Sequence, residues 1–282
     1  MSDALETERQ AAKAERLRAL HHAADPLVLV NVWDVASARI VESLGFPAVA
    51  TTSAGIANAM GYPDGEAIPL ALMIECVGRI VRAVGVPVTA DLEAGYGNTI
   101  EGVEETARQA IACGSVGLNL EDATANEARP LVDAALQAER VRVVRRTAAA
   151  LGVPLVINAR TDAFLHGGEM PRGRRMEEAL SRAQMYLEAG ADCIFVPGRL
   201  ERDEIAQLAR EIAGPINVLA NERTPPLAEL KALGVKRVSL GSSPMAYAMA
   251  CFKVAALEVR DEGTFDFAGR RIPYAELNAL FR

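Results

Sequence analysis

Cysteine is scarce in this sequence, and it never stands where cysteine chemistry would need it. The four cysteines, Cys76, Cys113, Cys193 and Cys251, lie far apart, with no CxxC pair and no histidine nearby. This spacing argues against a disulfide framework and against a zinc site. We therefore expect reduced, buried thiols in a cytoplasmic protein.

The sequence also lacks a basic block and a long apolar run. Lysine and arginine are scattered, and the formal net charge is −7. Such a chain has no bulk attraction to nucleic acid or to an anionic membrane surface. No segment has about 18 uninterrupted apolar residues, and the charged N-terminal segment 2–22 lacks the apolar stretch of a signal peptide. We expect no nucleic acid partner and no membrane span.

What the sequence does contain is a repeated pairing of a short apolar run with a longer helical segment. Almost wholly apolar runs are typical of parallel strands covered on both faces, and their alternation with helices indicates βαβ units. Eight runs follow this pattern: 27–32, 48–52, 87–91, 116–120, 154–159, 192–197, 215–220 and 236–241.

Glycine marks the end of several of the helical segments, as at Gly152 and Gly234, and a short turn and a strand follow. Glycine supplies the left-handed residue that ends many helices. We expect one (β/α)8 TIM barrel domain over residues 1–282, with an N-terminal helix in 1–22 and additional C-terminal helices in 245–282. A doubly wound open sheet is the alternative, and the regular spacing of eight units favours closure.

The first of these C-terminal helices has an unusual composition. The segment 245–259 is apolar on nearly every face, with Lys253 as the main exception. A helix of this kind is normally buried on all sides, which the outer face of one barrel cannot provide. The segment therefore predicts a homo-oligomer.

Acidic residues follow the strands of the predicted barrel, at the end where the active sites of such barrels lie. Asp64, Asp91, Glu93 and Glu121 would converge on one mouth, although any one of them could instead cap a helix. Like charges packed together are costly unless a cation neutralises them. Oxygen ligands suit Mg2+, with Mn2+ as an alternative, rather than zinc. Arg160 would clamp a substrate carboxylate through its planar guanidinium.

Several short motifs resemble those of the isocitrate lyase/phosphoenolpyruvate mutase superfamily. The resemblance runs from about residue 20 to residue 259, and the motifs are specific in combination. They are Thr89 to Gly97 (TADLEAGYG), Asn119 to Asp122 (NLED), Asn158 to Asp162 (NARTD), Ser53-Ala54-Gly55 with Gly61 to Asp64 in the strand-two loop, and Leu219-Ala220-Asn221 after strand seven.

The resemblance implies a metal site. Asp91 would bind Mg2+ directly, while Glu93, Glu121 and Asp64 would hold its water molecules. Asp64 and Glu121 would also form the catalytic group together with Arg160.

The resemblance also implies a substrate site. Ser53, Ala54 and Gly55 would bind the substrate carboxylate, partly through backbone amides. Arg160 would neutralise the oxyanion or the carboxylate, and Asn221 would orient the substrate.

Members of the superfamily make or break a C–C or P–C bond next to a 2-oxo acid, through an enolate-like species. The resemblance therefore implies a Mg2+-dependent enzyme acting on a small 2-oxo acid, assembled as a homotetramer with exchanged C-terminal helices. C–C cleavage, decarboxylation and P–C rearrangement or hydrolysis all remain open. The alternative is a non-catalytic protein that binds a 2-oxo acid on the same barrel.

Three positions depart from the superfamily pattern in small ways. Glu93 stands where many members carry aspartate, which changes the reach of the side chain and not its charge. Ala54 stands where lyase members often carry glycine, and Gly198 stands where 2-methylisocitrate lyases carry glutamate.

The largest departure is the loop 123–130 after strand four. Lyase members carry a Lys-(Lys/Arg)-Cys-Gly-His sequence there, and its cysteine helps to protonate the departing enolate. This loop contains no cysteine, lysine or histidine. We therefore do not expect cleavage of isocitrate or 2-methylisocitrate, unless Glu127 or, second, His166 supplies the proton.

Overall fold

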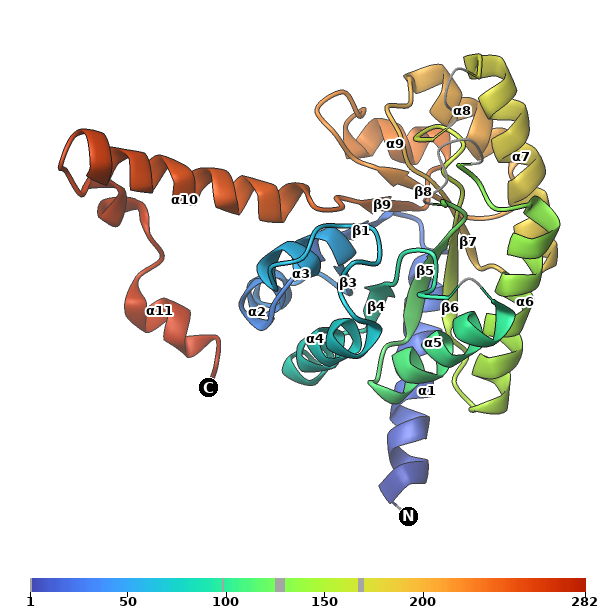
Figure 1. Cartoon of the computed structure of the whole chain (residues 1–282), viewed down its shortest axis with the longest axis horizontal. Helices are drawn as coiled ribbons and strands as arrows, with labels where there is room; N and C mark the ends of the chain where they lie inside the picture. Colours follow the sequence, from blue (N-terminus) through green and yellow to red (C-terminus); the bar gives the residue numbers. More distant parts are fainter. Residues whose placement is uncertain (1, 98, 125–129, 167–169) are drawn as a thin grey trace.

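The computed structural model describes residues 2–97, 99–124, 130–166 and 170–282, and its centre is one parallel β-sheet. Figure 1 shows the helices arranged around this sheet. The strands are β1 (Leu27–Leu29), β2 (Asn31–Val32), β3 (Val49–Thr51), β4 (Val88–Asp91), β5 (Gly117–Glu121), β6 (Val156–Arg160), β7 (Cys193–Val196), β8 (Ile216–Leu219) and β9 (Arg237–Ser239).

The pairing of the strands closes the sheet into a barrel. The order is β1-β9-β8-β7-β6-β5-β4-β3-β2, so β1 pairs with β9 while β2 pairs with β3. Only Val30 separates β1 from β2, and together they act as the first of eight strands. The first predicted apolar run contains both β1 and β2, and each of the other seven overlaps one of the remaining strands. The predicted (β/α)8 barrel is confirmed, and the open doubly wound sheet is not adopted.

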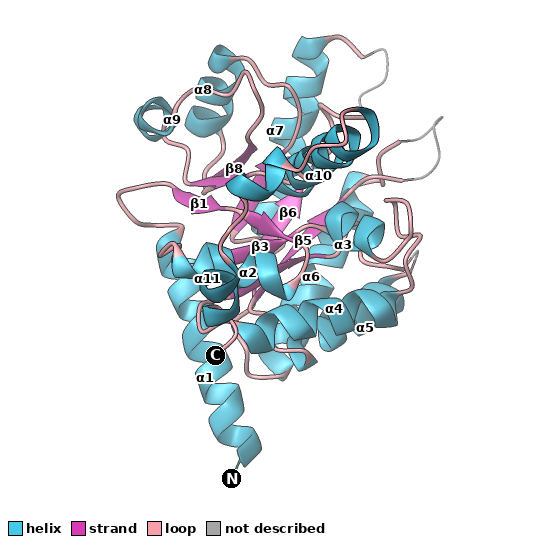
Figure 2. Ribbon diagram, turned by 90° about the vertical axis from the view of Figure 1, so that its left-hand side faces the viewer, coloured by secondary structure: helices cyan, strands magenta, loops and turns pink. Residues whose placement is uncertain are grey.

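Helices follow the strands and cover the outside of the barrel (Figure 2). Polar caps begin several of them, such as Asp34 before α2 and Thr99 before α5, and Gly234 ends α9 with a φ of 93°. These covering helices are α2 (Val35–Ser43), α3 (Ser53–Ala59), α4 (Leu70–Ala83), α5 (Ile100–Ala112), α6 (Ala134–Ala150), α7 (Arg172–Glu188), α8 (Arg202–Glu211) and α9 (Leu227–Leu233).

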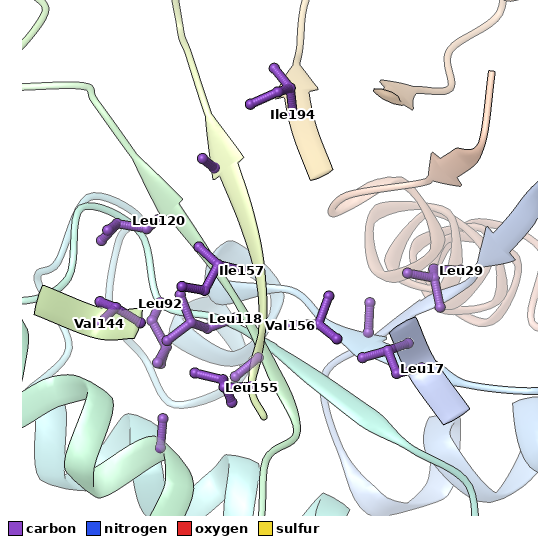
Figure 3. Packing of buried hydrophobic residues seen from close by; sticks show 14 of the residues in the cluster. Leu17, Leu29, Leu92, Leu118, Leu120, Val144, Leu155, Val156, Ile157 and Ile194 are labelled. Carbon is purple, nitrogen blue, oxygen red and sulfur yellow. The ribbon is translucent and has the colours of Figure 1, made fainter. Parts of the chain in front are cut away.

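The N-terminal helix α1 (Ser2–Leu20) packs under the amino-terminal ends of the strands. Leu17 is fully buried in the same cluster as Leu29 and Val156, and Figure 3 shows these three side chains converging. Arg18 donates from Nε to Asp192 at 2.9 Å, which ties α1 to the start of β7. Apolar contact and this ion pair together hold α1 on the base of the barrel.

The interior of the barrel is more polar than the layers of branched aliphatic residues that commonly fill such barrels. Asn119 Oδ1 accepts a hydrogen bond from Asn158 Nδ2 at 2.7 Å, and Asn217 Nδ2 donates to Ser239 Oγ at 3.2 Å. Arg237 is 1 % exposed among these side chains. The barrel therefore carries hydrogen-bonded groups from its base towards the rim where the strands end.

The C-terminal helix α10 (Ser243–Asp261) projects away from the barrel, followed by the 3-10 helix η1 (Asp266–Arg270) and by α11 (Tyr274–Ala279) (Figure 1). Tyr247 and Phe252 are 74 % and 71 % exposed on α10. Cys251 is exposed on the same helix. The expectation of buried thiols therefore holds for Cys193 alone: Cys76 and Cys113 are only partly buried, and Cys251 is exposed because α10 leaves the body of the chain.

In the part of the chain that is described, none of the helices has both the length and the apolar character needed to cross a membrane.

We predict that His21 makes folding sensitive to acid. Its Nδ1 lies 2.8 Å from the Leu17 carbonyl and its Nε2 lies 3.4 Å from Arg237 Nη1, so the neutral ring fits between them. Burial, and then the charge of Arg237, lower the pKa of His21 to about 4. The unfolded chain, with an ordinary value near 6.5, binds more protons between pH 4 and 6.5. Stability should therefore fall as pH drops through this window, by up to about 3 kcal/mol.

The measurement is the free energy of unfolding in urea at pH 7 and at pH 4.5. In the parent, the free energy of unfolding should differ between the two pH values, and in the H21Q variant this difference should be about 2–3 kcal/mol smaller. The matched control is H22Q, since His22 is the neighbouring and more exposed histidine. If H21Q and the parent respond equally to acid, His21 is not the group that senses it.

Candidate active site

Two adjoining cavities open at the rim where the strands end. The larger has a volume of about 450 Å³ and the smaller about 240 Å³. Ser53, Asp64 and Arg160 line both cavities. Glu93 and Glu121 face the larger one and Asp91 the smaller one. The structure thus brings together the acids and the arginine that the strand ends predicted.

Asp91 is the last residue of β4 and forms a junction between neighbouring elements. Its Oδ2 accepts hydrogen bonds from the Ser53 backbone amide at 3.0 Å and the Ser53 hydroxyl at 2.8 Å. Its Oδ1 accepts from Asn119 Nδ2 at 3.1 Å. A carboxylate offers about four acceptor positions, so three bonds leave room for one further ligand from the cavity.

The orientation of Asn119 is fixed from below. Its Oδ1 accepts from Asn158 Nδ2 at 2.7 Å and from Arg237 Nη2 at 3.4 Å. With the oxygen occupied by two donors, the NH2 group must face Asp91. The hydrogen-bond network therefore determines which way the amide points.

Glu93 is held in a strained loop beside this junction. Its φ is 51°, and Glu66 and Tyr96 also have positive φ values, of 59° and 51°. Its carboxylate accepts from the Glu66 amide at 2.6 Å and from the Tyr96 hydroxyl at 3.1 Å. Burial, with smaller contributions from Asp64 and Asp91, raises the pKa of Glu93 to about 7. Strain and crowded charge of this kind cluster at functional sites.

Arg160, at the end of β6, is clamped between two acids. Nη1 lies 2.5 Å from Glu121, and Nε and Nη2 donate to Asp162 at 2.6 and 3.0 Å. Its guanidinium also stacks over Phe195, 5.8 Å from the ring centre. Burial lowers the pKa of Arg160, but Glu121 and Asp162 outweigh burial and raise it. Arg160 therefore stays charged, and a substrate anion must share it with Glu121.

Asp122, although adjacent to Glu121, points out of the barrel. Residues alternate between the two faces of a strand, so Asp122 meets Arg182 Nη1 at 3.0 Å and the Tyr186 hydroxyl at 2.7 Å on α7. Its Oδ1 accepts from the Asp162 backbone amide at 2.8 Å. Asp122 thus supports Asp162 from behind and does not face the cavities.

The residues expected to bind the substrate are placed unequally. Ser53 and Ala54 line the smaller cavity at the start of α3, but the Ser53 amide already donates to Asp91. The Gly55 amide donates to Thr52 Oγ1 at 3.3 Å. The Asn221 side chain accepts from the Arg223 amide at 2.9 Å, and among the described lining residues Asn221 belongs to neither cavity.

One cationic side chain of the larger cavity was missed by sequence reasoning. Arg140, on α6, is 5 % exposed and lines this cavity. Among the described residues its Nε has no hydrogen-bond partner, and its Nη1 lies 3.5 Å from Gln137. The available signal was a charged residue on the face of α6 that also carries Val141 and Val144. His166 also lines the cavity, whereas Glu127 lies outside the described residues.

The donors at the rim fit a magnesium ion that keeps most of its water. Within the described residues, no three acidic, histidine or cysteine side chains gather closely enough to form a complete protein cage for a metal. Mg2+ does not need one, because it commonly takes one or two carboxylates and retains several waters. Asp91 has an acceptor position left, and the acids around Glu93 carry negative charge that a cation would relieve.

Comparison with known proteins agrees with this architecture. The family model described as phosphoenolpyruvate phosphomutase matches residues 17–260. A phosphoenolpyruvate phosphomutase of Streptomyces hygroscopicus is 31% identical over 277 residues, which cover 94% of this chain and 86% of that protein. A 2-methylisocitrate lyase of Aeropyrum pernix is 29% identical over 257 residues, covering 88% and 80%. A solved structure described as a lyase/mutase of Burkholderia cenocepacia has a TM-score of 0.90 and 38% identity, and 97% of each chain is covered.

Proposed function

The chain belongs to the phosphoenolpyruvate phosphomutase family, in the isocitrate lyase/phosphoenolpyruvate mutase superfamily, and from this premise we propose that it is a Mg2+-dependent enzyme. It makes or breaks a C–C or P–C bond next to a small 2-oxo acid. The observation that carries the proposal is the rim itself, where Asp91 keeps a position for a ligand beside the buried cation of Arg160.

The chemistry follows from where negative charge develops. Breaking a bond at C3 of a 2-oxo acid leaves an electron pair that delocalises onto the 2-oxo oxygen. Arg160, fixed by Asp162 and Phe195, is placed to stabilise that oxygen without reorganising. Mg2+, when bound, adds Lewis-acid stabilisation of the same charge.

Different residues of the rim would bind the metal and the substrate. Asp91 would hold the metal directly, with Asp64, Glu93 and Glu121 holding its waters. Ser53, Ala54 and Gly55 at the start of α3 would take the substrate carboxylate. Asn221 would reach the substrate only if its loop moved, because its side chain is bonded to the Arg223 amide.

We propose further that the substrate carries an anionic group at each end. Arg140 and Arg160 line the same cavity, and among the described residues Arg140 forms no ion pair, although the charge of Glu66 in the same cavity acts on it. A 2-oxo acid with a second carboxylate or a phosphonate would place that second group at Arg140, while Ser53, Ala54 and Gly55 hold its carboxylate and Arg160 holds its 2-oxo oxygen. The choice among C–C cleavage, decarboxylation and P–C chemistry stays open.

Turnover of a substrate panel tests the proposed function. The panel is oxaloacetate, phosphonopyruvate, isocitrate and 2-methylisocitrate, each with Mg2+ and with EDTA. We expect Mg2+-dependent turnover of oxaloacetate or phosphonopyruvate and only weak release of succinate from the other two. Tight Mg2+-dependent oxalate binding with no turnover would favour the non-catalytic alternative. Robust turnover of 2-methylisocitrate would show that another group, tested first with E127Q and then with H166Q, supplies the proton.

We predict that D91A loses Mg2+-dependent binding of oxalate, a mimic of the enolate. The variant loses three hydrogen bonds but also relieves the repulsion between Asp91 and Glu93, so the fold should persist. By calorimetry, oxalate affinity in Mg2+ should fall at least about 100-fold. D34A is the matched control, since Asp34 caps α2 beyond the first strand. If D91A binds oxalate as tightly as the parent, the metal assignment is wrong.

We predict that R140M weakens the binding of a ligand with two anionic groups more than the binding of a ligand with one. Its dissociation constant for oxaloacetate should rise about 10-fold or more, as expected for loss of a charged hydrogen bond, while that for pyruvate should change less than about twofold. R140K should recover part of the affinity. R142M is the control, because Arg142 is exposed on the same helix and paired with Glu139. If R140M raises the dissociation constants of oxaloacetate and pyruvate equally, Arg140 does not bind a second anionic group of the substrate.

We propose that the assembly is a homotetramer in which the C-terminal helices are exchanged between subunits. Most residues of α10 are exposed in the single chain, and Met245 is its one buried residue. Apolar surface of that extent is rarely left in water. We propose that a second copy of the same chain covers this surface, because most oligomers are symmetric assemblies of identical chains.

We predict a tetramer by light scattering at micromolar concentration. The double variant Y247E/F252E should shift it to smaller species, because two charges would be buried in the apolar contact. L44E is the control, since Leu44 is 70 % exposed on the barrel itself. A monomeric parent protein would contradict the proposed assembly.

A further inference from the structure

Arg237 is a buried cation that the proposed chemistry does not use. It lies on β9 inside the barrel, is 1 % exposed, and is the largest of the fully buried side chains in the described part of the chain. Its Nη1 lies 3.4 Å from His21 Nε2 and its Nη2 lies 3.4 Å from Asn119 Oδ1. Among the described residues its Nε has no hydrogen-bond partner and no carboxylate pairs with it.

Such an arrangement costs stability. Both hydrogen bonds are long for a charged donor, and an unpaired charge in a protein interior is poorly compensated. Burial lowers the pKa of Arg237 to about 10, which still leaves it protonated at neutral pH. An apolar side chain of similar size would fill the same space at less cost, so packing alone does not account for an arginine here.

The contacts of Arg237 lead towards the rim. Together with Asn158, it occupies Asn119 Oδ1, and this leaves Asn119 Nδ2 to donate to Asp91 at 3.1 Å. Asp91 is also the carboxylate whose charge acts on Arg237 from above. One amide therefore separates the buried cation from the residue proposed to bind the metal.

We propose that Arg237 is a positioning residue, which holds the Asn119 amide in one orientation and thereby keeps the Asp91 carboxylate directed into the rim cavity. The inference rests on the role proposed above for Asp91. It assigns a function to a group that lies two hydrogen bonds below the site and has no access to the ligand.

The experiment combines a stability measurement with a double-mutant cycle. In R237M the melting temperature should equal or exceed that of the parent, because an unpaired buried charge has gone. Oxalate affinity in Mg2+, and Mn2+ affinity measured by electron paramagnetic resonance, should each fall about 10-fold or more. The oxalate and Mn2+ affinities of R237K should lie between those of R237M and the parent, since lysine keeps the charge but lacks the planar guanidinium with its several donors.

The cycle tests whether Arg237 acts through Asn119. In an N119A background, the R237M substitution should change oxalate and Mn2+ affinity less than about twofold, because the intermediary is already absent. N217A is the control for loss of a polar group inside the barrel, as Asn217 bonds to Ser239 away from this path. It should leave both affinities unchanged.

Each other outcome overturns the inference. If R237M lowers the melting temperature strongly or fails to fold, the cation is a structural requirement. If R237M folds and binds oxalate and Mn2+ like the parent, Asp91 does not depend on it, while the proposed function survives. If the parent itself shows no Mg2+-dependent oxalate binding, the metal assignment fails first and the inference fails with it.

Discussion

Closure of a parallel barrel forces the carboxyl ends of all strands onto one rim, and the two-residue alternation decides which side chains enter it. Asp91, Glu93, Glu121 and Asp162 arrive there as a consequence of their register. So much negative charge in partly buried surroundings is tolerated only with compensation. Arg160 pairs with both Glu121 and Asp162 and offsets part of their charge, while the proposed metal ion would offset the charge around Asp91 and Glu93.

The polar interior below the rim adds to this cost. Asn158 Oδ1, Thr89 Oγ1 and Arg237 Nε are buried without a hydrogen-bond partner in the described part of the chain. The barrel tolerates them because its outer layer, between strands and helices, is a continuous apolar cluster that includes Leu118 and Val144. The apolar contacts that stabilise the fold thus lie between the strands and the helices, and the polar side chains inside the barrel can position the residues of the site.

The sequence predicted the strands well because each is a nearly continuous apolar run, and this pattern depends only on local burial. It predicted the acids of the rim because they follow those runs. It could not separate Glu121 from Asp122 without applying the alternation, which sends Asp122 to Arg182 on α7. Nor could it find Arg140 or Arg237, since their surroundings are assembled from segments far apart in the chain, as when Arg237 reaches His21 and Asn119.

Gly198, which follows β7 (the sixth strand of the barrel), stands where the lyase pattern has a glutamate, and the local backbone conformation requires a glycine there. Gly198 has a φ of 147°, a conformation that other residues rarely adopt. A Cβ atom added there would lie 2.9 Å from the Phe164 Cβ. Phe164 is itself buried and packed under the Arg172 guanidinium, 5.9 Å from the ring centre, so it cannot easily move aside. A glutamate at this position would require the loops after β6 and β7 to be rebuilt together. The glycine that replaces the glutamate of the lyase pattern is therefore matched by a backbone that has no room for a larger side chain unless both loops change.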